Sequence, residues 1–177
     1  LSSVPVVLVG FFLVETNLIS KLRNIKVIGW MTLIFGILLY VSDKFKLDKK
    51  INTDFNYKSA LLIGTFQILS LIPGVSRSGI TITAGRFLEF KRVEAAKISF
   101  FLSIPTLAAV SFFGINNLLE TESLRFSLTN LLSIFLSFIF SLITIKYFLK
   151  YISKFSLSVF VIYRIVLGII ILIFSYL

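Results

Sequence analysis

The stretch Leu71-Ile-Pro-Gly-Val-Ser-Arg-Ser-Gly-Ile-Thr-Ile-Thr-Ala-Gly-Arg86 brings Pro, Gly, Ser, Thr and Arg together inside an otherwise apolar sequence. Apolar residues run up to it from Leu61 to Ile72 and resume at Ile80. Pro73 disfavours helical dihedral angles at the residue before it, and Gly74 permits unusual ones. The stretch therefore predicts two broken helices joined by a loop at membrane depth. Such irregular backbone is tolerated only where protein or a water-filled cavity covers it.

The composition indicates an all-α, polytopic membrane protein. Of the 177 residues, 57% are hydrophobic, whereas soluble domains have about 45–50%. The net charge is +10, but the Lys and Arg residues lie mostly at the ends of apolar runs, where membrane proteins place them. We therefore expect the bilayer as a partner, and no nucleic acid. The sequence has no Cys and no His, which excludes disulfides and argues against a zinc site of the usual kind.

The apolar runs divide the chain into spans and two short arms within one integral membrane domain, residues 1–177. Bilayer-spanning helices need about 20 apolar residues, so the two short arms predict a re-entrant helix-loop-helix hairpin. The predicted spans are Val4–Val14, Val27–Val41, Ile98–Ile115 (kinked at Pro105), Leu128–Leu149 and Val159–Tyr176, and the arms are Ser59–Ile72 and Ile80–Leu88.

Three polar segments are interpreted as connectors. Asp43–Lys58 carries an excess of Lys, which indicates a solvated cytoplasmic loop, and Glu89–Lys97 is a second charged connector. Asn116–Ser127 is slightly acidic and is expected on the opposite side of the membrane. The chain begins with Leu1 inside an apolar segment, so we expect it to be a fragment that lacks an N-terminal part.

The polar residues after the break have the chemistry of a phosphate site. A helix that begins near Gly79 would point free N–H groups at an anion. The guanidinium of Arg77 can bind two phosphate oxygens at once, and the hydroxyls of Ser76, Ser78 and Thr81 can donate to others. A charge at membrane depth is costly, which makes Arg77 the first functional candidate. The alternative is a plain helix kink, with Arg77 extended towards the interface.

Two further residues are candidates with strong alternatives. Arg164 lies near the start of the last span and could be a second cation for a multiply charged ligand, or it could reach the membrane interface. Gln67 on the first arm could contact substrate, although an amide on an apolar arm more often joins helices.

Three segments resemble the bacterial undecaprenyl-diphosphatase family, the bacitracin-resistance proteins, and the resemblance covers the whole chain. The most specific is Gly64-Thr-Phe-Gln-Ile-Leu-Ser-Leu-Ile-Pro-Gly-Val-Ser-Arg-Ser-Gly-Ile-Thr-Ile82; the others are Ser99–Pro105 and the motifs Tyr147-Phe-Leu149 and Ile162-Tyr-Arg164. The resemblance implies two inverted repeats, each with a re-entrant hairpin, in a bacterial inner membrane protein. It also implies removal of the terminal phosphate from undecaprenyl diphosphate, which supplies a lipid carrier for cell-wall precursors and is connected with bacitracin resistance.

Carried over by motif, the resemblance assigns catalysis to Arg77 and Ser76, and substrate binding to these two with Ser78, Gly79, Thr81, Arg164 and Gln67. The family's glutamate-rich E-x-x-x-E stretch and its Ser-Ser-Thr-Gly-His run are missing from this sequence. The resemblance therefore implies the C-terminal portion of an enzyme, inactive alone, with a divalent cation (Mg²⁺ or Ca²⁺) held by residues of the absent portion. A homodimer is a further possibility that it leaves open.

A transporter or flippase for an anionic prenyl lipid is the alternative, because inverted repeats with broken helices that meet at the midplane are also a transporter architecture. The sequence alone does not separate the two functions.

Overall fold

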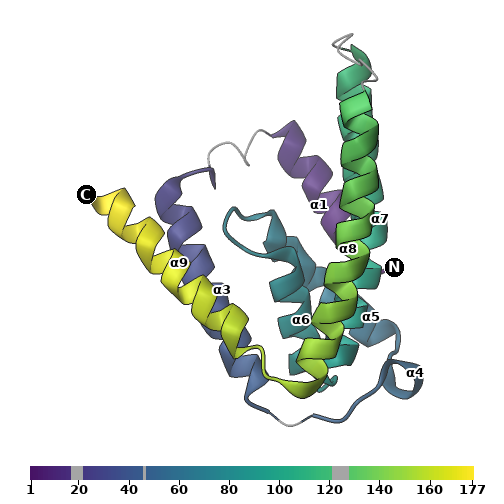
Figure 1. Ribbon diagram of the computed structural model, residues 1–177, viewed down its shortest axis with the longest axis vertical. Coiled ribbons are helices and arrows are strands. Elements are labelled where there is room, and N and C mark those ends of the chain that lie inside the picture. Colours follow the sequence, from purple (N-terminus) through teal and green to yellow (C-terminus); the bar gives the residue numbers. More distant parts are fainter. Residues whose placement is uncertain (17–21, 46, 121–127) are drawn as a thin grey trace.

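The computed structural model describes residues 1–16, 22–45, 47–120 and 128–177, and over these residues the chain is helical apart from connecting loops and one isolated β-bridge (Figure 1). This confirms the all-α prediction. The helices are α1 Val4–Glu15, α3 Ile25–Asp43, α4 Ile51–Asp54, α5 Tyr57–Ile68, the 3₁₀ helix η1 Leu69–Leu71, α6 Arg77–Phe87, α7 Arg92–Glu120, α8 Leu128–Lys154 and α9 Ser158–Tyr176.

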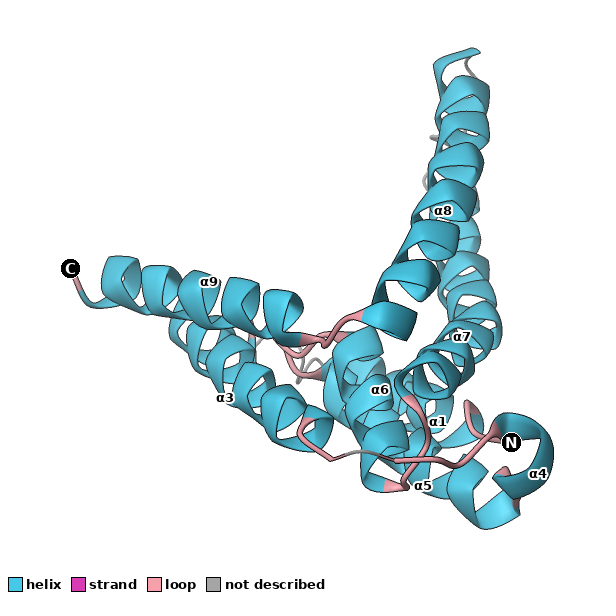
Figure 2. Ribbon diagram, turned by 60° about the horizontal axis from the view of Figure 1, so that its bottom comes forward, coloured by secondary structure: helices cyan, strands magenta, loops and turns pink. Residues whose placement is uncertain are grey.

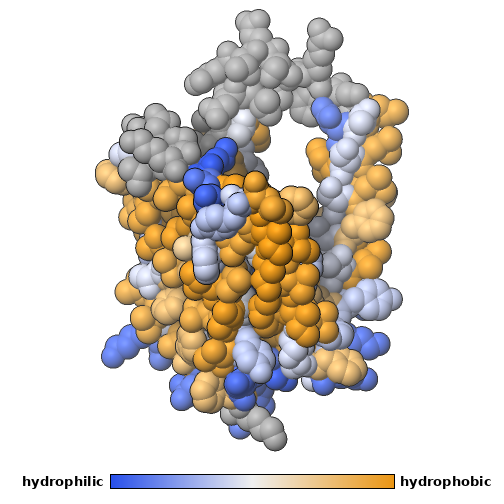
Figure 3. All heavy atoms as spheres, turned by 90° about the vertical axis from the view of Figure 1, so that its left-hand side faces the viewer, coloured by the Kyte–Doolittle hydropathy of each residue, from blue (hydrophilic) through white to orange (hydrophobic). Residues whose placement is uncertain are grey.

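Four of the described helices, α3, α7, α8 and α9, are long and apolar enough to cross a membrane. Each contains one of the predicted spans, so the chain is a multi-pass membrane protein. The first predicted span corresponds to α1, which has only 12 residues. Figure 3 shows the apolar side chains of one face gathered in a broad band, with hydrophilic residues concentrated below it.

The long helices form two arms that diverge from a common base (Figures 1 and 2). Helices α3 and α9 lie side by side in one arm, and α7 and α8 lie side by side in the other. Glycines allow the close approach of α3 and α9, since a Cβ on Gly29 would lie 2.8 Å from Leu172 Cγ and a Cβ on Gly168 would lie 3.1 Å from Leu33 Cβ.

The predicted hairpin is present between the two arms. The first half of the hairpin is α5 continued by η1, and its second half is α6. Between them Gly74 adopts a positive φ of 93°, which glycine tolerates without steric cost. A parallel bridge joins Lys49, which precedes α4, to Phe90, which follows α6, so the segments that flank the hairpin meet at the base of the molecule.

Helix α6 begins at Arg77, three residues before the predicted arm Ile80–Leu88 and two residues before the helix start expected near Gly79. The reason is a helix cap: Ser76 has extended backbone, and its hydroxyl accepts a hydrogen bond from the N–H of Gly79 at 3.1 Å. Serine is among the preferred residues for this position.

All three predicted connectors overlap helices of the structure. The segment Glu89–Lys97 is mostly helical, because α7 already begins at Arg92. The segment Asp43–Lys58 contains the helix α4, and its first residue, Asp43, is the buried end of α3 and not part of a solvated loop. Helix α7 also extends to Glu120, into the third predicted connector, whose residues 121–127 lie outside the described part of the chain.

Asp43 joins four helices at the base of the two arms. Its Oδ1 accepts a hydrogen bond from Arg92 Nε at 2.6 Å and lies 3.7 Å from Arg86 Nε, while its Oδ2 accepts from the N–H of Leu157 at 2.9 Å. Asp43 ends α3, Arg86 belongs to α6, Arg92 begins α7 and Leu157 caps α9. A buried carboxylate with partners on this many elements fixes how the arms leave the base.

Candidate phosphate-binding cavity

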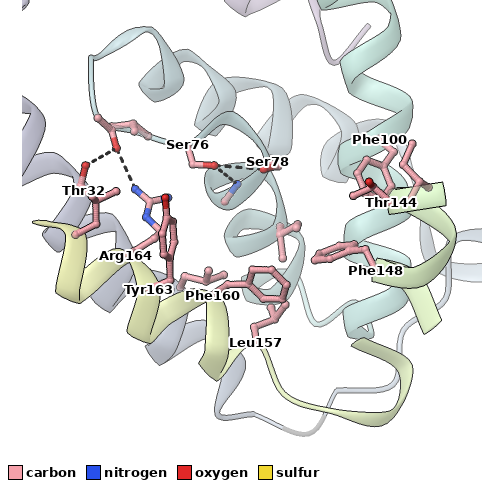
Figure 4. Close-up of a pocket in the computed structure, with 17 residues that line it drawn as sticks. Thr32, Ser76, Ser78, Phe100, Thr144, Phe148, Leu157, Phe160, Tyr163 and Arg164 are labelled. Carbon is pink, nitrogen blue, oxygen red and sulfur yellow. Dashed lines mark hydrogen bonds between the residues drawn. The ribbon is translucent and has the colours of Figure 1, made fainter. Parts of the chain in front are cut away.

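A cavity of about 550 Å³ lies at the helix break, between the two arms (Figure 4). Its walls come from α3, α6, α7, α8 and α9 together with the loop after Pro73. One end is polar and is lined by Thr32, Gly74, Ser76, Ser78, Gly79 and Arg164. The other end is apolar and contains the rings of Phe100, Phe148 and Phe160. The cavity therefore suits a ligand with a polar head and an apolar tail.

The carbonyl oxygen of Gly74 anchors the loop to the arm formed by α3 and α9. It accepts hydrogen bonds from Arg164 Nη2 at 3.0 Å and from the Thr32 hydroxyl at 3.3 Å (Figure 4). Any side chain at position 74 would be obstructed, because a Cβ there would lie 2.5 Å from the carbonyl oxygen of Ile28. Because the helix is broken here, the carbonyl of Gly74 makes no helical hydrogen bond and instead accepts one from Arg164 on α9.

Arg164 is a buried cation that the described residues leave largely unpartnered. The residue is 8% exposed, and only its Nη2 donates a hydrogen bond, whereas Nε and Nη1 have no partner. No salt bridge joins it to a carboxylate of the described residues. A Cβ on Gly79 would lie 2.8 Å from Arg164 Nη1, so the guanidinium lies directly beside the start of α6. A buried charge without a counter-ion is costly, and an anionic ligand would remove that cost.

The N-terminus of α6 adds hydrogen-bond donors next to this guanidinium. The first N–H groups of a helix have no partner within the helix. Here the N–H of Gly79 is taken by the Ser76 hydroxyl and that of Ile80 by the Ser76 carbonyl, while those of Arg77 and Ser78 remain at the tip. The hydroxyls of Ser76 and Ser78 lie 3.3 Å apart at the wall of the cavity. Cation, hydroxyls and helix N-terminus together form a cradle for phosphate oxygens.

Of the seven predicted site residues, the structure brings Ser76, Ser78, Gly79 and Arg164 to this cavity and leaves three outside its wall. Arg77 is half-buried beside it. Thr81 is 1% exposed, and its hydroxyl donates to the carbonyl of Arg77 at 2.9 Å and lies 2.7 Å from Ser99 Oγ. Gln67 is fully buried and its Nε2 donates to the Thr106 hydroxyl at 2.9 Å. The substrate roles of these three stay predictions.

Comparison with known proteins decides the family. Residues 1–170 match the family described as Bacitracin resistance protein BacA. The undecaprenyl-diphosphatase of Pelagibacter ubique (strain HTCC1062) is 51% identical over 177 residues, which cover 99% of this chain and 69% of that protein. The undecaprenyl-diphosphatase of Jannaschia sp. (strain CCS1) is 37% identical over 176 residues, covering 99% of this chain and 66% of that protein.

The chain belongs to the BacA family. This confirms the resemblance found in the sequence. A third relative, from Roseobacter denitrificans (strain ATCC 33942 / OCh 114), is also named undecaprenyl-diphosphatase and is 35% identical over 176 residues, which cover 99% of this chain and 66% of that protein. The BacA-family chain thus spans about two thirds of the length of the curated relatives that it matches.

The cavity of this BacA-family chain includes polar residues that the sequence did not single out. Thr32 and Thr144 each lie inside a long apolar span, where a single hydroxyl is easily taken for a helix-packing residue. A signal was nevertheless present on α9, because Phe160, Arg164 and Leu167 lie at helical spacing and so face the same side. That pattern places Arg164 on the cavity wall and not at the membrane interface.

The polar groups that line the cavity of this BacA-family chain do not fit a Mg²⁺ or Ca²⁺ site as metal ligands. Such ions take mostly carboxylate oxygens, and the cavity wall offers hydroxyls, one backbone carbonyl and a cation. The described residues also contain no group of three Asp or Glu side chains that could hold a metal. The wall described here is suited to bind the anion itself.

Proposed function

We propose that this chain carries the diphosphate-binding part of an undecaprenyl-diphosphate phosphatase, which hydrolyses the lipid diphosphate to undecaprenyl phosphate and inorganic phosphate. The observation that carries the proposal is Arg164, a buried guanidinium with two unpartnered nitrogens beside the N-terminus of α6. The names of the relatives support the substrate. They favour a phosphatase over the transporter alternative, since none of the quoted relatives is named as a transporter.

In the proposed mechanism, the residues of this chain bind and orient the diphosphate. Arg164, with the hydroxyls of Ser76 and Ser78, holds the phosphate oxygens at the polar end of the cavity. Charge that develops on the transferred phosphoryl group is stabilised by the guanidinium and by the N–H groups at the tip of α6, which act strongly where water is excluded. Arg77 is half-buried beside the tip, and we propose that its side chain contacts the terminal phosphate.

Three further expectations from the sequence remain proposals: a divalent cation, the inner membrane and a homodimer. A divalent cation would be held by residues other than those of the cavity wall described above, and no step of the mechanism is derived through it. The protein is proposed to reside in the bacterial inner membrane, which fractionation would test. A homodimer is proposed on the apolar face of α8, where residues 128–147 are all exposed, and cross-linking in the membrane would test it.

The test measures phosphate release from undecaprenyl diphosphate by the purified full-length protein in detergent micelles. We expect Arg164→Gln to lower kcat/KM by about 100-fold, because transition-state charge loses a preorganised donor, and Arg77→Ala to abolish turnover. Arg23→Gln, which removes an exposed arginine that does not line the cavity, is the matched control and should leave turnover unchanged. Turnover at the wild-type level in Arg164→Gln would remove the proposal.

A further inference from the structure

Three aromatic rings from three different helices form the apolar wall of the cavity, and we refer to them as the aromatic wall. Phe100 of α7, Phe148 of α8 and Phe160 of α9 all line the cavity (Figure 4). The ring of Phe148 meets that of Phe100 edge-on, with centroids 5.8 Å apart, and that of Phe160 edge-on at 5.2 Å. Edge-to-face pairs are a favourable geometry for aromatic rings, so the wall has a defined shape.

The aromatic wall is adjacent to the phosphate cradle along α9. Phe160 and Arg164 are four residues apart, which corresponds to a rise of about 6 Å along one face of the helix. Both residues line the cavity, so the first carbons of a lipid chain whose phosphate contacts Arg164 can reach the ring of Phe160. The ring of Phe148 is next to that position because it packs on Phe160.

The aromatic wall also lies on the route by which a lipid would reach the cradle. Phe160 is 36% exposed and Tyr163, which lines the same cavity, is 63% exposed. In a membrane-spanning helix, exposed apolar side chains face lipid. A chain attached to the bound headgroup can therefore leave the cavity over the wall without being enclosed by the described residues.

From these observations we infer that the aromatic wall is a specificity site that binds the first isoprenoid units next to the diphosphate. The inference rests on the proposed function and deepens it. Methyl branches and double bonds give a prenyl chain a stiff, broad outline that fills the space between edge-on rings, whereas a straight saturated chain leaves gaps and loses dispersion contacts. The wall thus distinguishes prenyl diphosphates from other lipids with a phosphorylated head.

The first experiment compares two substrates of equal main-chain length, farnesyl diphosphate and dodecyl diphosphate, with the full-length protein in micelles. We expect Phe148→Ala and Phe160→Ala to lower kcat/KM for the farnesyl compound by about tenfold and for the dodecyl compound by less than about twofold. Phe135→Ala removes a ring from the lipid-exposed part of α8 and should change neither value. Equal losses on both substrates, or no loss on either, would overturn the inference.

The second experiment needs neither a variant nor turnover. A farnesyl diphosphate analogue with a photoreactive diazirine on its first isoprenoid unit is irradiated with the wild-type protein, and the labelled peptides are identified by mass spectrometry. Labels within residues 97–103, 144–151 and 157–167, which contain the three rings of the wall, support the inference, and labels confined to other segments overturn it. If the wild-type protein releases no phosphate from any diphosphate while these segments are labelled, the proposed hydrolysis fails but the prenyl-binding site stands.

Discussion

Two buried arginines of this chain, Arg86 at the base and Arg164 at the cavity, have opposite surroundings. Arg86 is 3% exposed, its Nη1 donates to the carbonyl of Phe90 at 3.0 Å and its Nη2 to the carbonyl of Phe45. Its Nε makes no hydrogen bond with the described residues but lies 3.7 Å from Asp43 Oδ1, so the guanidinium has a carboxylate counter-ion. Arg164 is 8% exposed and has one acceptor, the Gly74 carbonyl, and no carboxylate among the described residues.

This difference separates a cation whose charge is paired within the fold from a cation that the described residues leave without a counter-ion. Burying a charge costs free energy unless it is paired and hydrogen-bonded. At Arg86 the protein supplies those partners itself. At Arg164 the described residues do not, and an anion bound in the cavity would remove the cost that they leave. The contrast predicts that removing the partner of Arg86 harms stability, whereas removing Arg164 harms binding.

The largest effect is expected for Asp43→Ala. The substitution leaves Arg86 and Arg92 without their carboxylate and the N–H of Leu157 without an acceptor. Breaking a buried ion pair by removing one partner costs about 3–5 kcal/mol, and we expect a loss of this size in the free energy of unfolding. The measurement is unfolding of the detergent-solubilised protein by increasing sodium dodecyl sulfate.

The matched variant for this experiment is Arg164→Gln, measured without ligand. We expect its free energy of unfolding to fall by no more than about 1 kcal/mol, because one hydrogen bond is lost while the cost of an unpaired buried charge disappears. A loss as large as that of Asp43→Ala would show that both arginines have the same structural role.

A smaller effect, on binding alone, is expected for Gly79→Ala. The added Cβ would lie 2.8 Å from Arg164 Nη1 and push the guanidinium out of the cradle. We expect the affinity for farnesyl diphosphate to fall about tenfold, the low end of what a hydrogen bond to a charged group contributes. Gly114→Ala is the control, since a Cβ there meets nothing within 4 Å. Titration of both variants by calorimetry compares them, and an equal affinity would contradict the placement of Arg164.

The smallest effect is expected for Gln67→Leu. The amide Oε1 of Gln67 is buried without a hydrogen-bond partner, and only its Nε2 is engaged, with Thr106. Replacing such a group by an apolar one of similar size changes the free energy of unfolding by less than about 1 kcal/mol. The affinity of the Gln67→Leu variant for farnesyl diphosphate distinguishes the two predictions made for this residue. An unchanged affinity assigns Gln67 to helix packing, and a loss of affinity assigns it to substrate binding.

The fold was predictable from the sequence where local chemistry determines it. Pro73 and Gly74 mark the break, and the lengths of the apolar runs identify the four spanning helices to within a few residues. The predicted start of α6 was wrong because the hydroxyl of Ser76 caps the helix. The helix therefore begins at Arg77, in a stretch whose residues are also compatible with a loop. Local signals of this kind reach only a few residues along the chain.

Contacts between distant segments explain what the sequence did not reveal. Asp43 stands in a run of charged residues and looks solvated, but its partners lie 43, 49 and 114 residues away along the chain. Arg164 was ranked below Arg77 for the same reason, since only the packing of α9 on α3 brings it 90 residues back to Gly74. The sequence predicted that Ser76, Ser78, Gly79 and Arg164 belong to one site, and their common position at the cavity wall depends on this tertiary packing.

The carbonyl of Gly74 has a consequence for how this site responds to mutation. Its oxygen orients both Arg164 and Thr32, yet it is part of the backbone and persists whatever amino acid is encoded at that codon. Substitutions at position 74 will act through collision with Ile28 instead. A mutational scan would therefore report a steric requirement and overlook the acceptor. An ester in place of the Gly74–Val75 amide would weaken that acceptor, while also removing the N–H of Val75 that donates to the carbonyl of Ile72.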